Sequence, residues 1–534
     1  MARALHSSSV EARTGIRMAD GLSDGEQDMS KRIETSALSR MAAMVCGSLI
    51  LAATPALAKT RVTVAVTETI AGANPYADSV SLMNAVWCQV YGCMVRYDNA
   101  TETYTSDLFE SWAVEDPLTW VFKLKPGLKR SNGEPVVAED FTHSIDRIRN
   151  DPNSKQKHRL NYVAGVEIRD PQTVVIKTTE PTATLLEYLK SVIITSKALY
   201  DKYGADADKE YPIGAGPYML GRLQTDNYVS IRKNPDHPLV TAENPDEVIF
   251  KIMKEPEQRL TALFNDEVQI AQFIPPQLVP RLEASKDAKI AWNESVEVMF
   301  LAMRPDAKPF DNPLVRQAVA HAVDKDAIIR SILGGQASRL DGPVGPGQVG
   351  YSPDFNPAYP YDPARSKALL AEAGYPDGVE IDFTATIGRY TSDKQICEAI
   401  ADMLQKAGFK VNLKTPEWST MWDDVQNGKT AFYYMGRGTV LDPSVMLAQY
   451  FETGGSPRVG YSNPEVDKML QTERQTFDNA ERLKLLQQAM AKIVEEAPGV
   501  FMWRHKMAWG VASNVDFKPV PTGEINGWQI KVSE

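Results

Sequence analysis

The chain has 534 residues, of which 43% are hydrophobic and 24% are charged, and its formal net charge is −11 at pH 7. A chain with this length and apolar content can bury a large core and normally divides into two or three domains. The excess of acidic residues argues against nucleic acid or an anionic membrane surface as the main partner.

The amino-terminal region has the features of a secretory signal. A basic pair at residues 31–32 precedes an apolar run at residues 41–53, and small residues follow at 54–58. The run is too short to span a bilayer as a stable anchor, and the order of the three parts is typical of a signal peptide. We predict cleavage after Ala58 and export to the periplasm as a soluble protein, because no other segment approaches the length of a membrane span.

This signal peptide accounts for residues 29–58 and leaves residues 1–28 as a polar extension without periodicity. Two explanations stay open. Either translation starts at Met18 or Met29 rather than at Met1, or the leader has an unusual extension.

The exported part retains the cysteines Cys88, Cys93 and Cys397. Apolar spacing predicts one helix through Leu82, Val86, Val90 and Met94. Two cysteines five residues apart on that helix would be separated by about 7.5 Å along its axis, beyond comfortable disulfide reach. We interpret Cys88 and Cys93 as small apolar core residues, with a disulfide or a metal site as less favoured alternatives.

The first elements of the exported chain predict an α/β layer. Alternation of apolar residues predicts a strand at residues 61–66, and a loop at 69–79 leads to the helix described above. A second strand at 120–125 is followed by a Pro-Gly turn at 126–127. A helix then begins near residue 138, with acidic residues in its first turn.

Apolar residues at helical spacing predict an amphipathic helix from residue 315 to residue 332, ended by a Gly-Gly pair. Residues 340–363 are rich in proline and glycine and contain no periodic run, so we expect a long loop.

Strands and helices alternate in the segment that follows this loop, which predicts a mostly parallel sheet. The expected elements are a strand at 381–387, a helix at 393–407, a strand at 409–413, a strand at 431–435 and a helix at 444–450.

The strand at residues 431–435 consists of five apolar or aromatic residues, so we expect it to be buried on both faces. Gly436-Arg437-Gly438-Thr439 follows at its carboxyl end, which is where ligands bind in open α/β sheets. Glycines there let a ligand approach the backbone closely. A glycine turn without a ligand is the simpler interpretation of this stretch alone, and a dinucleotide fingerprint is excluded because Leu441 occupies the place of its third glycine.

No catalytic motif occurs in the sequence: there is no Gly-x-Ser-x-Gly elbow, no His-Glu-x-x-His and no Cys-x-x-Cys pair. Catalytic groups can converge from distant segments, so an exported hydrolase acting on peptides or glycans stays an alternative.

Residues 107–148 resemble the signature region of the family 5 extracellular solute-binding proteins, the peptide and nickel class of ABC-importer receptors. Its pattern is A-x-x-W … Y-x-F-x-L-R-x-G-V-x-F-x-D-G-x-P-x-x-A-x-D-V. This chain departs from the pattern at Trp120, which replaces a tyrosine, and at Arg130-Ser131, where an aromatic and a polar residue are usual. Further matches occur in order at residues 214–218, 315–318, 322–325, 361–365, 369–376, 388–390 and 460–467.

The resemblance implies a periplasmic-binding-protein-like α/β fold of the large three-lobe type, with mixed and parallel sheets around a hinged cleft. Lobe I would combine residues 59–105, 213–303 and 500–534, lobe II would be inserted at 106–212, and lobe III would span 304–499. Ligand would be enclosed between lobes, and membrane partners would recognise the closed form.

The resemblance also implies the function. We expect the periplasmic substrate-binding component of an ABC importer, which binds a peptide or peptide-like solute and delivers it to the inner-membrane permease subunits and, through them, to the ATPase. We expect a monomer that is not an enzyme and that needs no cofactor or metal. Opines, glycosides and metal chelates stay open as ligands.

Arg389 is the first predicted ligand residue, because it follows the strand at 381–387 and matches an arginine that binds the ligand carboxylate in dipeptide receptors. The ordinary alternative is a surface arginine that pairs with Asp393.

The other predicted ligand residues belong to one loop and three aromatic positions. Gly436, Arg437, Gly438 and Thr439 are expected to contact ligand through backbone amides, the Thr439 hydroxyl and the charge of Arg437. Trp418, Trp422 and Tyr76 are assigned as apolar walls, with core packing as the alternative for at least one tryptophan.

In related dipeptide receptors, an aspartate after the corresponding strand pairs with the amino group of the peptide. Here the comparable place holds Thr439, and Asp442 resembles the family's structural Asp-Pro. Because this loop has no carboxylate, we expect capping of a peptide's amino group to weaken binding little. Removal of its carboxylate should weaken binding strongly through Arg389.

Overall fold

The computed structural model describes residues 60–533, except 71, 78–79, 100, 102, 191, 354–358 and 439–440. The described residues form one compact unit. The predicted extension, the signal peptide and its cleavage point after Ala58 lie outside the described residues. Within the described part, no helix has the length and apolar character needed to cross a membrane.

An eleven-stranded mixed sheet is the largest sheet of the fold. Its strands follow the order β15-β14-β16-β12-β17-β11-β1-β10-β9-β8, with β13 beside β17. Their bounds are β1 (Arg61–Val66), β8 (Tyr218–Gln224), β9 (Tyr228–Lys233), β10 (Glu247–Ile252), β11 (Ile270–Ile274), β12 (Ala288–Met303), β13 (Ala337–Arg339), β14 (Val379–Thr384), β15 (Phe409–Lys414), β16 (Phe432–Arg437) and β17 (Gly499–Ala512).

The part of the chain around β1 also contains three α-helices and two short antiparallel pairs of strands. These are α1 (Ser81–Tyr91), α6 (Pro256–Phe264), α7 (Val279–Glu283), β2 (Arg96–Asp98) with β3 (Thr103–Thr105), and β18 (Val515–Phe517) with β19 (Ile530–Val532).

A separate four-stranded antiparallel sheet lies within residues 106–212, in the order β4-β5-β7-β6. Its elements are β4 (Phe109–Asp116), β5 (Thr119–Leu124), β6 (Val163–Asp170), β7 (Thr173–Thr178), α2 (Ala138–Asn150), α3 (Leu185–Leu189), α4 (Lys197–Tyr203) and α5 (Ala207–Glu210). The strand and helix predicted at 120–125 and near 138 correspond to β5 and α2. The four strands, α2 and α3 share one buried apolar cluster with α1 and β1.

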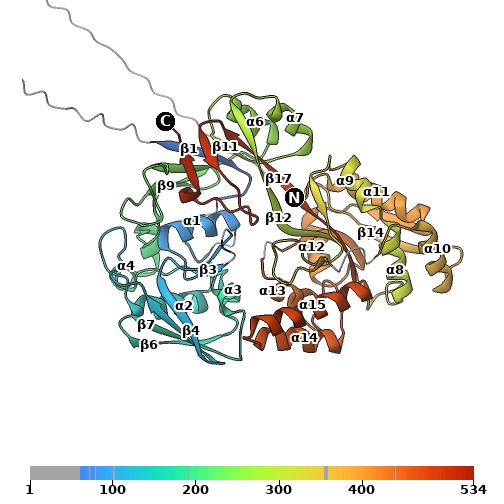
Figure 1. Ribbon diagram of the computed structural model, residues 1–534, viewed down its shortest axis with the longest axis horizontal. Helices are drawn as coiled ribbons and strands as arrows, with labels where there is room; N and C mark the ends of the chain where they lie inside the picture. The colour runs from blue at the N-terminus through green and yellow to red at the C-terminus, as the bar shows by residue number, and fades with distance from the viewer. Residues whose placement is uncertain are drawn as a thin grey trace, which may run out of the picture. The chain divides into compact units, whose positions relative to one another are not determined.

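Most of the helices of residues 304–499 surround the β14, β15 and β16 end of the large sheet, and Figure 1 shows them in yellow to red. They are α8 (Pro313–Ala322), α9 (Lys325–Ser331), α10 (Pro363–Glu372), α11 (Asp393–Lys406), α12 (Trp418–Gln426), α13 (Ser444–Phe451), α14 (Pro464–Gln475) and α15 (Asn479–Glu496). The loop predicted at 340–363 contains no α-helix before Pro363 and no strand among its described residues.

The alternation of strand and helix predicted from residue 381 onward is confirmed, with β14 ending three residues earlier than expected. Strand β14 is parallel to β15 and β16, but β16 is antiparallel to β12, so the sheet is mixed. The four residues 432–435 are at most 2% exposed, as the apolar run predicts.

The single helix predicted at residues 315–332 is wrong, because the structure divides it into α8 and α9. Val323 adopts an extended conformation between them. The Asp324 carboxylate accepts the N–H of Ala327 at 2.9 Å, which caps a new helix. A strong N-cap residue therefore overrides an apolar pattern that continues across the break.

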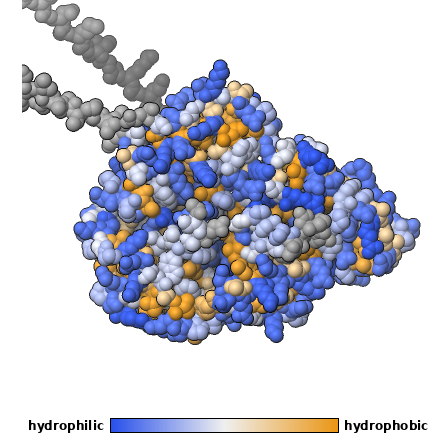
Figure 2. Space-filling view, in the orientation of Figure 1, coloured by the Kyte–Doolittle hydropathy of each residue, from blue (hydrophilic) through white to orange (hydrophobic). Residues whose placement is uncertain are grey.

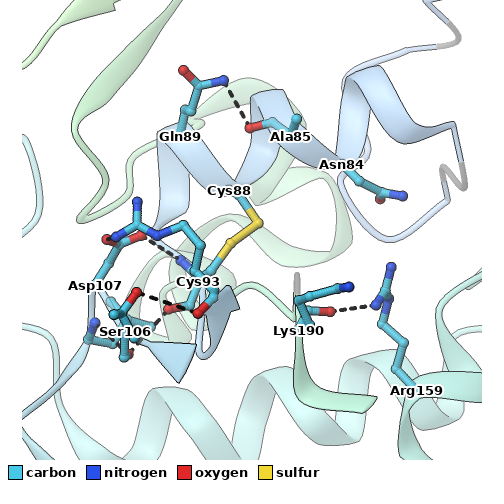
Figure 3. Close-up of a disulfide and its surroundings, with 12 residues drawn as sticks. Asn84, Ala85, Cys88, Gln89, Cys93, Ser106, Asp107, Arg159 and Lys190 are labelled. Atoms are coloured by element: carbon cyan, nitrogen blue, oxygen red, sulfur yellow. Dashed lines mark hydrogen bonds and ion pairs between the residues drawn. A yellow bond between two sulfur atoms is a disulfide. The ribbon is translucent and has the colours of Figure 1, made fainter. Parts of the chain in front are cut away.

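The interpretation of Cys88 and Cys93 as free core residues is also wrong, since they form a disulfide (Figure 3). Helix α1 ends at Tyr91, and Gly92 adopts a positive φ of 82° that turns the chain back. Cys93 therefore lies off the helix, and its Cα is 5.0 Å from that of Cys88. The helical separation assumed from sequence does not apply to a residue beyond the helix end.

Strands β12 and β17 pair along most of their length and connect the two ends of the large sheet (Figure 1). Their register shifts at two places, and the larger shift lies at residues 294–298 of β12: Glu294 pairs with Lys506, and Val298 pairs with Arg504. Three residues of β12 therefore oppose one of β17, so β12 has a bulge of two extra residues. We refer to residues 295–297 as the β12 bulge.

The surface is predominantly polar. Figure 2 shows hydrophilic residues over most of the visible face, interrupted by separate apolar patches. Apolar side chains gather instead in three buried clusters, one around β1 and α1, one around β14 to β16, and one between β12, β16 and helices α13 to α15.

Candidate functional site

Three arginines lie among aromatic side chains near the carboxyl ends of β14 and β16, and we call Arg389, Arg437 and Arg458 the arginine cluster. Arg437 is the last residue of β16, Arg389 lies in the turn between β14 and α11, and Arg458 follows α13. Because β14 and β16 are parallel, their carboxyl ends lie at the same edge of the sheet. This edge is where the sequence predicted ligand binding.

The turn at Arg389 is held by Asp393. The buried Asp393 carboxylate accepts the backbone N–H groups of Gly388, Arg389 and Tyr390 at 2.9 to 3.0 Å. The exposed Arg389 guanidinium instead lies over the rings of Tyr390 (5.1 Å) and Trp418 (5.3 Å). The carboxylate therefore orders the backbone of the turn and leaves the guanidinium available to a ligand.

Arg437 is half-buried against an aromatic ring. Its guanidinium carbon lies 3.9 Å from the ring centroid of Tyr450, and its Nη2 donates to the side-chain oxygen of Gln449 at 3.1 Å. The buried Nε has no hydrogen-bond partner among the described residues. Burial and repulsion from Arg458 lower the pKa of Arg437, and interaction with Tyr450 opposes the shift.

Arg458 completes the cluster and also contacts Tyr450. Its Nη1 donates to the Tyr450 hydroxyl at 2.7 Å, and its guanidinium lies 4.7 Å from the ring centroid of Trp422. Sequence reasoning missed Arg458, because it lies in an irregular loop 21 positions after Arg437 with no motif around it.

The predicted tryptophans lie beside these arginines. Trp418 and Trp422 follow each other by one helical turn in α12, and their rings stack with centroids 5.5 Å apart. Both are half-buried. They therefore serve at once as the edge of a core cluster and as stacking surfaces for Arg389 and Arg458.

Gly436 has a different role from the one its sequence suggested. It belongs to β16 rather than to a loop, and a Cβ atom there would lie 2.7 Å from Oε1 of Glu297. The missing side chain thus makes room for a carboxylate of the protein. Gly438, which does lie beyond the strand, has a positive φ of 78°, and Thr439 lies outside the described residues.

Glu297 is the second functional candidate that sequence reasoning missed. It lies in the β12 bulge, and its side chain is half-buried. Burial raises the pKa of the Glu297 carboxyl, and the charges of Arg389 and Arg437 oppose the shift. No pattern in the sequence indicates it, because the bulge interrupts the alternation of the strand.

The assignment of Tyr76 as a cleft wall does not fit the structure. Its side chain is 0% exposed, its hydroxyl donates to Thr195 Oγ1 at 3.0 Å, and Arg147 lies over its ring at 5.4 Å. These partners belong to the core around α2, not to the arginine cluster. Tyr76 therefore packs in the core, although it follows a strand.

A surface pocket of about 780 Å³ lies elsewhere, beside α7 and β12, and is lined partly by Pro276, Trp292 and Lys506. It contains none of the predicted ligand residues. Across the part of the chain that the structure describes, no group of three His, Cys, Asp or Glu side chains is placed to hold a metal ion.

The family model for bacterial extracellular solute-binding proteins, family 5 Middle, matches residues 103–458. The chain belongs to this family. It is therefore a ligand-binding receptor of the ABC-importer class and not an enzyme, which sets aside the hydrolase alternative.

Relatives of this family 5 protein match most of the chain. The glutathione-binding protein GsiB of Pectobacterium atrosepticum is 28% identical over 470 residues, covering 85% of this chain and 90% of the relative. GsiB of Escherichia coli K12 is 26% identical over 480 residues, covering 87% and 93%.

Solved structures show the same fold. HbpA2 from Haemophilus parasuis superposes with a TM-score of 0.79 at 22% identity, covering 89% of this chain and 100% of that one. The binding protein AgaA of A. tumefaciens R10, solved with agropinic acid, gives a TM-score of 0.71 at 25% identity, with coverage of 89% and 99%. The periplasmic-binding-protein-like α/β fold implied by the sequence is confirmed.

Proposed function

We propose that this receptor binds a small peptide-like solute that has at least two carboxylates. The observation behind the proposal is the arginine cluster: none of its three guanidinium groups forms an ion pair with a carboxylate among the described residues. Three cations and the single carboxylate of Glu297 leave an excess of positive charge, which complements a ligand with two anionic groups.

The names of the relatives support this ligand class. Glutathione is a tripeptide with two carboxylates and one amino group, and the matched relatives are named glutathione-binding proteins. Agropinic acid, bound by AgaA, is also a carboxylate. Glutathione is therefore the first ligand to test, and an opine acid is the second.

Within this proposal, Arg389 binds one carboxylate and Arg437 binds the other. Both guanidinium groups are preorganised by stacking on aromatic rings, which reduces the side-chain entropy lost on binding. Gly438 and Thr439, which follow β16, would contribute backbone N–H groups, and Trp418 and Trp422 would supply apolar contacts.

The proposal includes export and delivery. We propose that the signal at residues 29–58 is removed after Ala58, and that the mature monomer delivers its ligand to inner-membrane permease subunits coupled to an ATPase. The disulfide between Cys88 and Cys93 supports an oxidising compartment. Amino-terminal sequencing of the periplasmic form should give a start at Lys59, and a start far from it would contradict this part.

Calorimetry with glutathione tests the ligand class. The native protein should bind glutathione but not its diethyl ester, and Arg389→Ala should weaken glutathione binding by about 2 to 5 kcal/mol if the pair is desolvated. Arg281→Ala is the matched control, because Arg281 is exposed on α7 and pairs only with the exposed Glu257. Equal affinity for acid and ester would overturn the proposal, and mass spectrometry of the ligand released from the purified protein would then identify the solute.

A further inference from the structure

Glu297 occupies an unusual place in the fold, the last position of the β12 bulge. Bulges next to binding sites redirect a side chain that a regular strand would point elsewhere. The following residue, Val298, pairs with Arg437 of β16, so the bulge ends at the arginine cluster. The two-residue insertion therefore brings an acidic side chain to the edge of the sheet where the arginines lie.

The backbone of the bulge is fixed by hydrogen bonds from outside the strand and by one within the bulge. The N–H of Val296 donates to the carbonyl of Pro521 at 3.2 Å, and its carbonyl accepts from the Gln348 side chain at 3.3 Å. The N–H of Glu297 donates to Ser295 Oγ at 3.0 Å. These contacts hold the bulge in one conformation and aim the Glu297 side chain over Gly436.

The Glu297 carboxylate has no hydrogen bond or ion pair with any described residue, although Arg389 and Arg437 are the positive charges that act on it. A carboxylate enclosed in this way normally has a hydrogen-bonded partner, because burial without one is unfavourable. Gly436 gives it space rather than a bond. The arrangement leaves an acceptor directed at the site and not used by the protein itself.

We propose that Glu297 binds the ammonium group of the ligand and makes the receptor selective for solutes with a free amine. When ligand carboxylates pair with Arg389 and Arg437, those cations no longer balance Glu297, and a ligand ammonium restores the balance. This inference rests on the proposed function, because it concerns the same ligand. It also reverses the expectation from sequence, which rested on the absence of a carboxylate from the loop after β16 and therefore expected little sensitivity to amine capping.

The test compares glutathione with glutaryl-Cys-Gly, an analogue that lacks the amino group and adds no bulk. By calorimetry, the native protein should prefer glutathione by about 10- to 100-fold, as expected for a hydrogen-bonded charge pair. Glu297→Gln should reduce this preference to less than about threefold. Glu297→Asp, which retains the charge, should keep part of the preference, and Glu283→Gln, an exposed acid on α7, should keep all of it.

Each possible result shows which of the two proposals has failed, the proposed function or the role of Glu297. A native protein that binds neither compound contradicts the proposed function. A native protein that binds both within threefold, or a folded Glu297→Gln that keeps the full preference, overturns the role of Glu297 and leaves the carboxylate proposal standing. If Glu297→Gln does not fold, the preference of the native protein and of Glu297→Asp decides the question, since absence of selectivity in the native protein already excludes it.

Discussion

Arg437 and Asp442 are five positions apart in the sequence, but they belong to two polar groups that differ in how their charges are paired. Arg437 is part of the arginine cluster, whose guanidinium groups contact aromatic rings. Asp442 is part of a second group, the paired network of Asp442, Ser444, Glu473 and Arg482.

In the paired network, every charge has its partner within the chain. Arg482 contacts Asp442 at 2.7 Å and Glu473 at 3.0 Å, and the Ser444 hydroxyl donates to Glu473. All four residues are less than 9% exposed. Arginine belongs to both groups, so residue type alone does not separate structural charges from those proposed to bind ligand. The presence or absence of a partner in the chain does.

Breaking the paired network should give the largest effect. Arg482→Met removes one cation from between two buried carboxylates and should lower the free energy of unfolding by about 3 to 5 kcal/mol. Urea denaturation measures it, with Arg437→Met as the comparison variant, which should change the free energy of unfolding by less than about 1 kcal/mol. Equal destabilisation by the two variants would contradict the distinction between the groups.

The arginine cluster should show the opposite behaviour. Arg437→Met should weaken glutathione binding by about 1.5 to 3 kcal/mol, or roughly 10- to 150-fold, because the ligand loses a charged hydrogen-bond donor. Calorimetry measures this loss. Arg482→Met, assayed under conditions in which it is folded, should retain native affinity. An Arg437→Met variant with unchanged affinity would place the second carboxylate elsewhere.

The network should also respond to pH through Glu473. Burial raises its pKa to about 7, and Arg482 and the Ser444 hydroxyl oppose the shift. The folded state therefore holds more protons than the unfolded state between about pH 4.5 and 7, and stability falls as pH rises through this window. Relative to the native protein, Glu473→Gln should gain on the order of 1 to 3 kcal/mol across the window.

Thermal unfolding of both proteins from pH 4.5 to 8 measures this gain. The difference in stability between the two proteins at each pH removes the contributions of other buried groups such as Asp208 and His505, because these groups titrate in both proteins. A difference that is constant with pH would show that Glu473 is ionised throughout.

The smallest effect is expected at the aromatic support of the cluster. Trp422→Leu removes the ring under Arg458 and should weaken ligand binding by about 0.5 to 1 kcal/mol, since stacking positions the guanidinium without replacing its charge. Calorimetry resolves such a change as a two- to fivefold loss. A loss as large as that of Arg437→Met would instead indicate that Trp422 contacts the ligand directly.

The sequence predicted the parts of the fold and the site that depend on local pattern. The buried strand at 432–435, the alternation around it and the strand-end positions of Arg389 and Arg437 all follow from periodicity and from the resemblance. The roles of these residues toward a ligand stay predictions.

The parts that sequence analysis missed depend on one residue that changes the path of the chain. Gly92 ends α1 and allows the Cys88–Cys93 disulfide, and Asp324 starts a new helix inside an apolar pattern. Arg458 and Glu297 reach the site from a loop and a bulge, so their proximity to Arg437 depends on long-range pairing that a single sequence does not encode in any local pattern.

The size of the β12 bulge has a consequence for how such receptors can diverge. Successive side chains of a strand face opposite sides of the sheet, so an insertion of one residue would turn every later core residue of β12 outward. Two extra residues leave the side chains of Val298 and of all later β12 residues on the same sides of the sheet, and these residues keep their pairing with β16. Adding or deleting two residues in the β12 bulge can therefore introduce or remove a charge beside the arginine cluster without repacking the core. The interior of a strand is then a second place, besides the loops, where ligand preference can change.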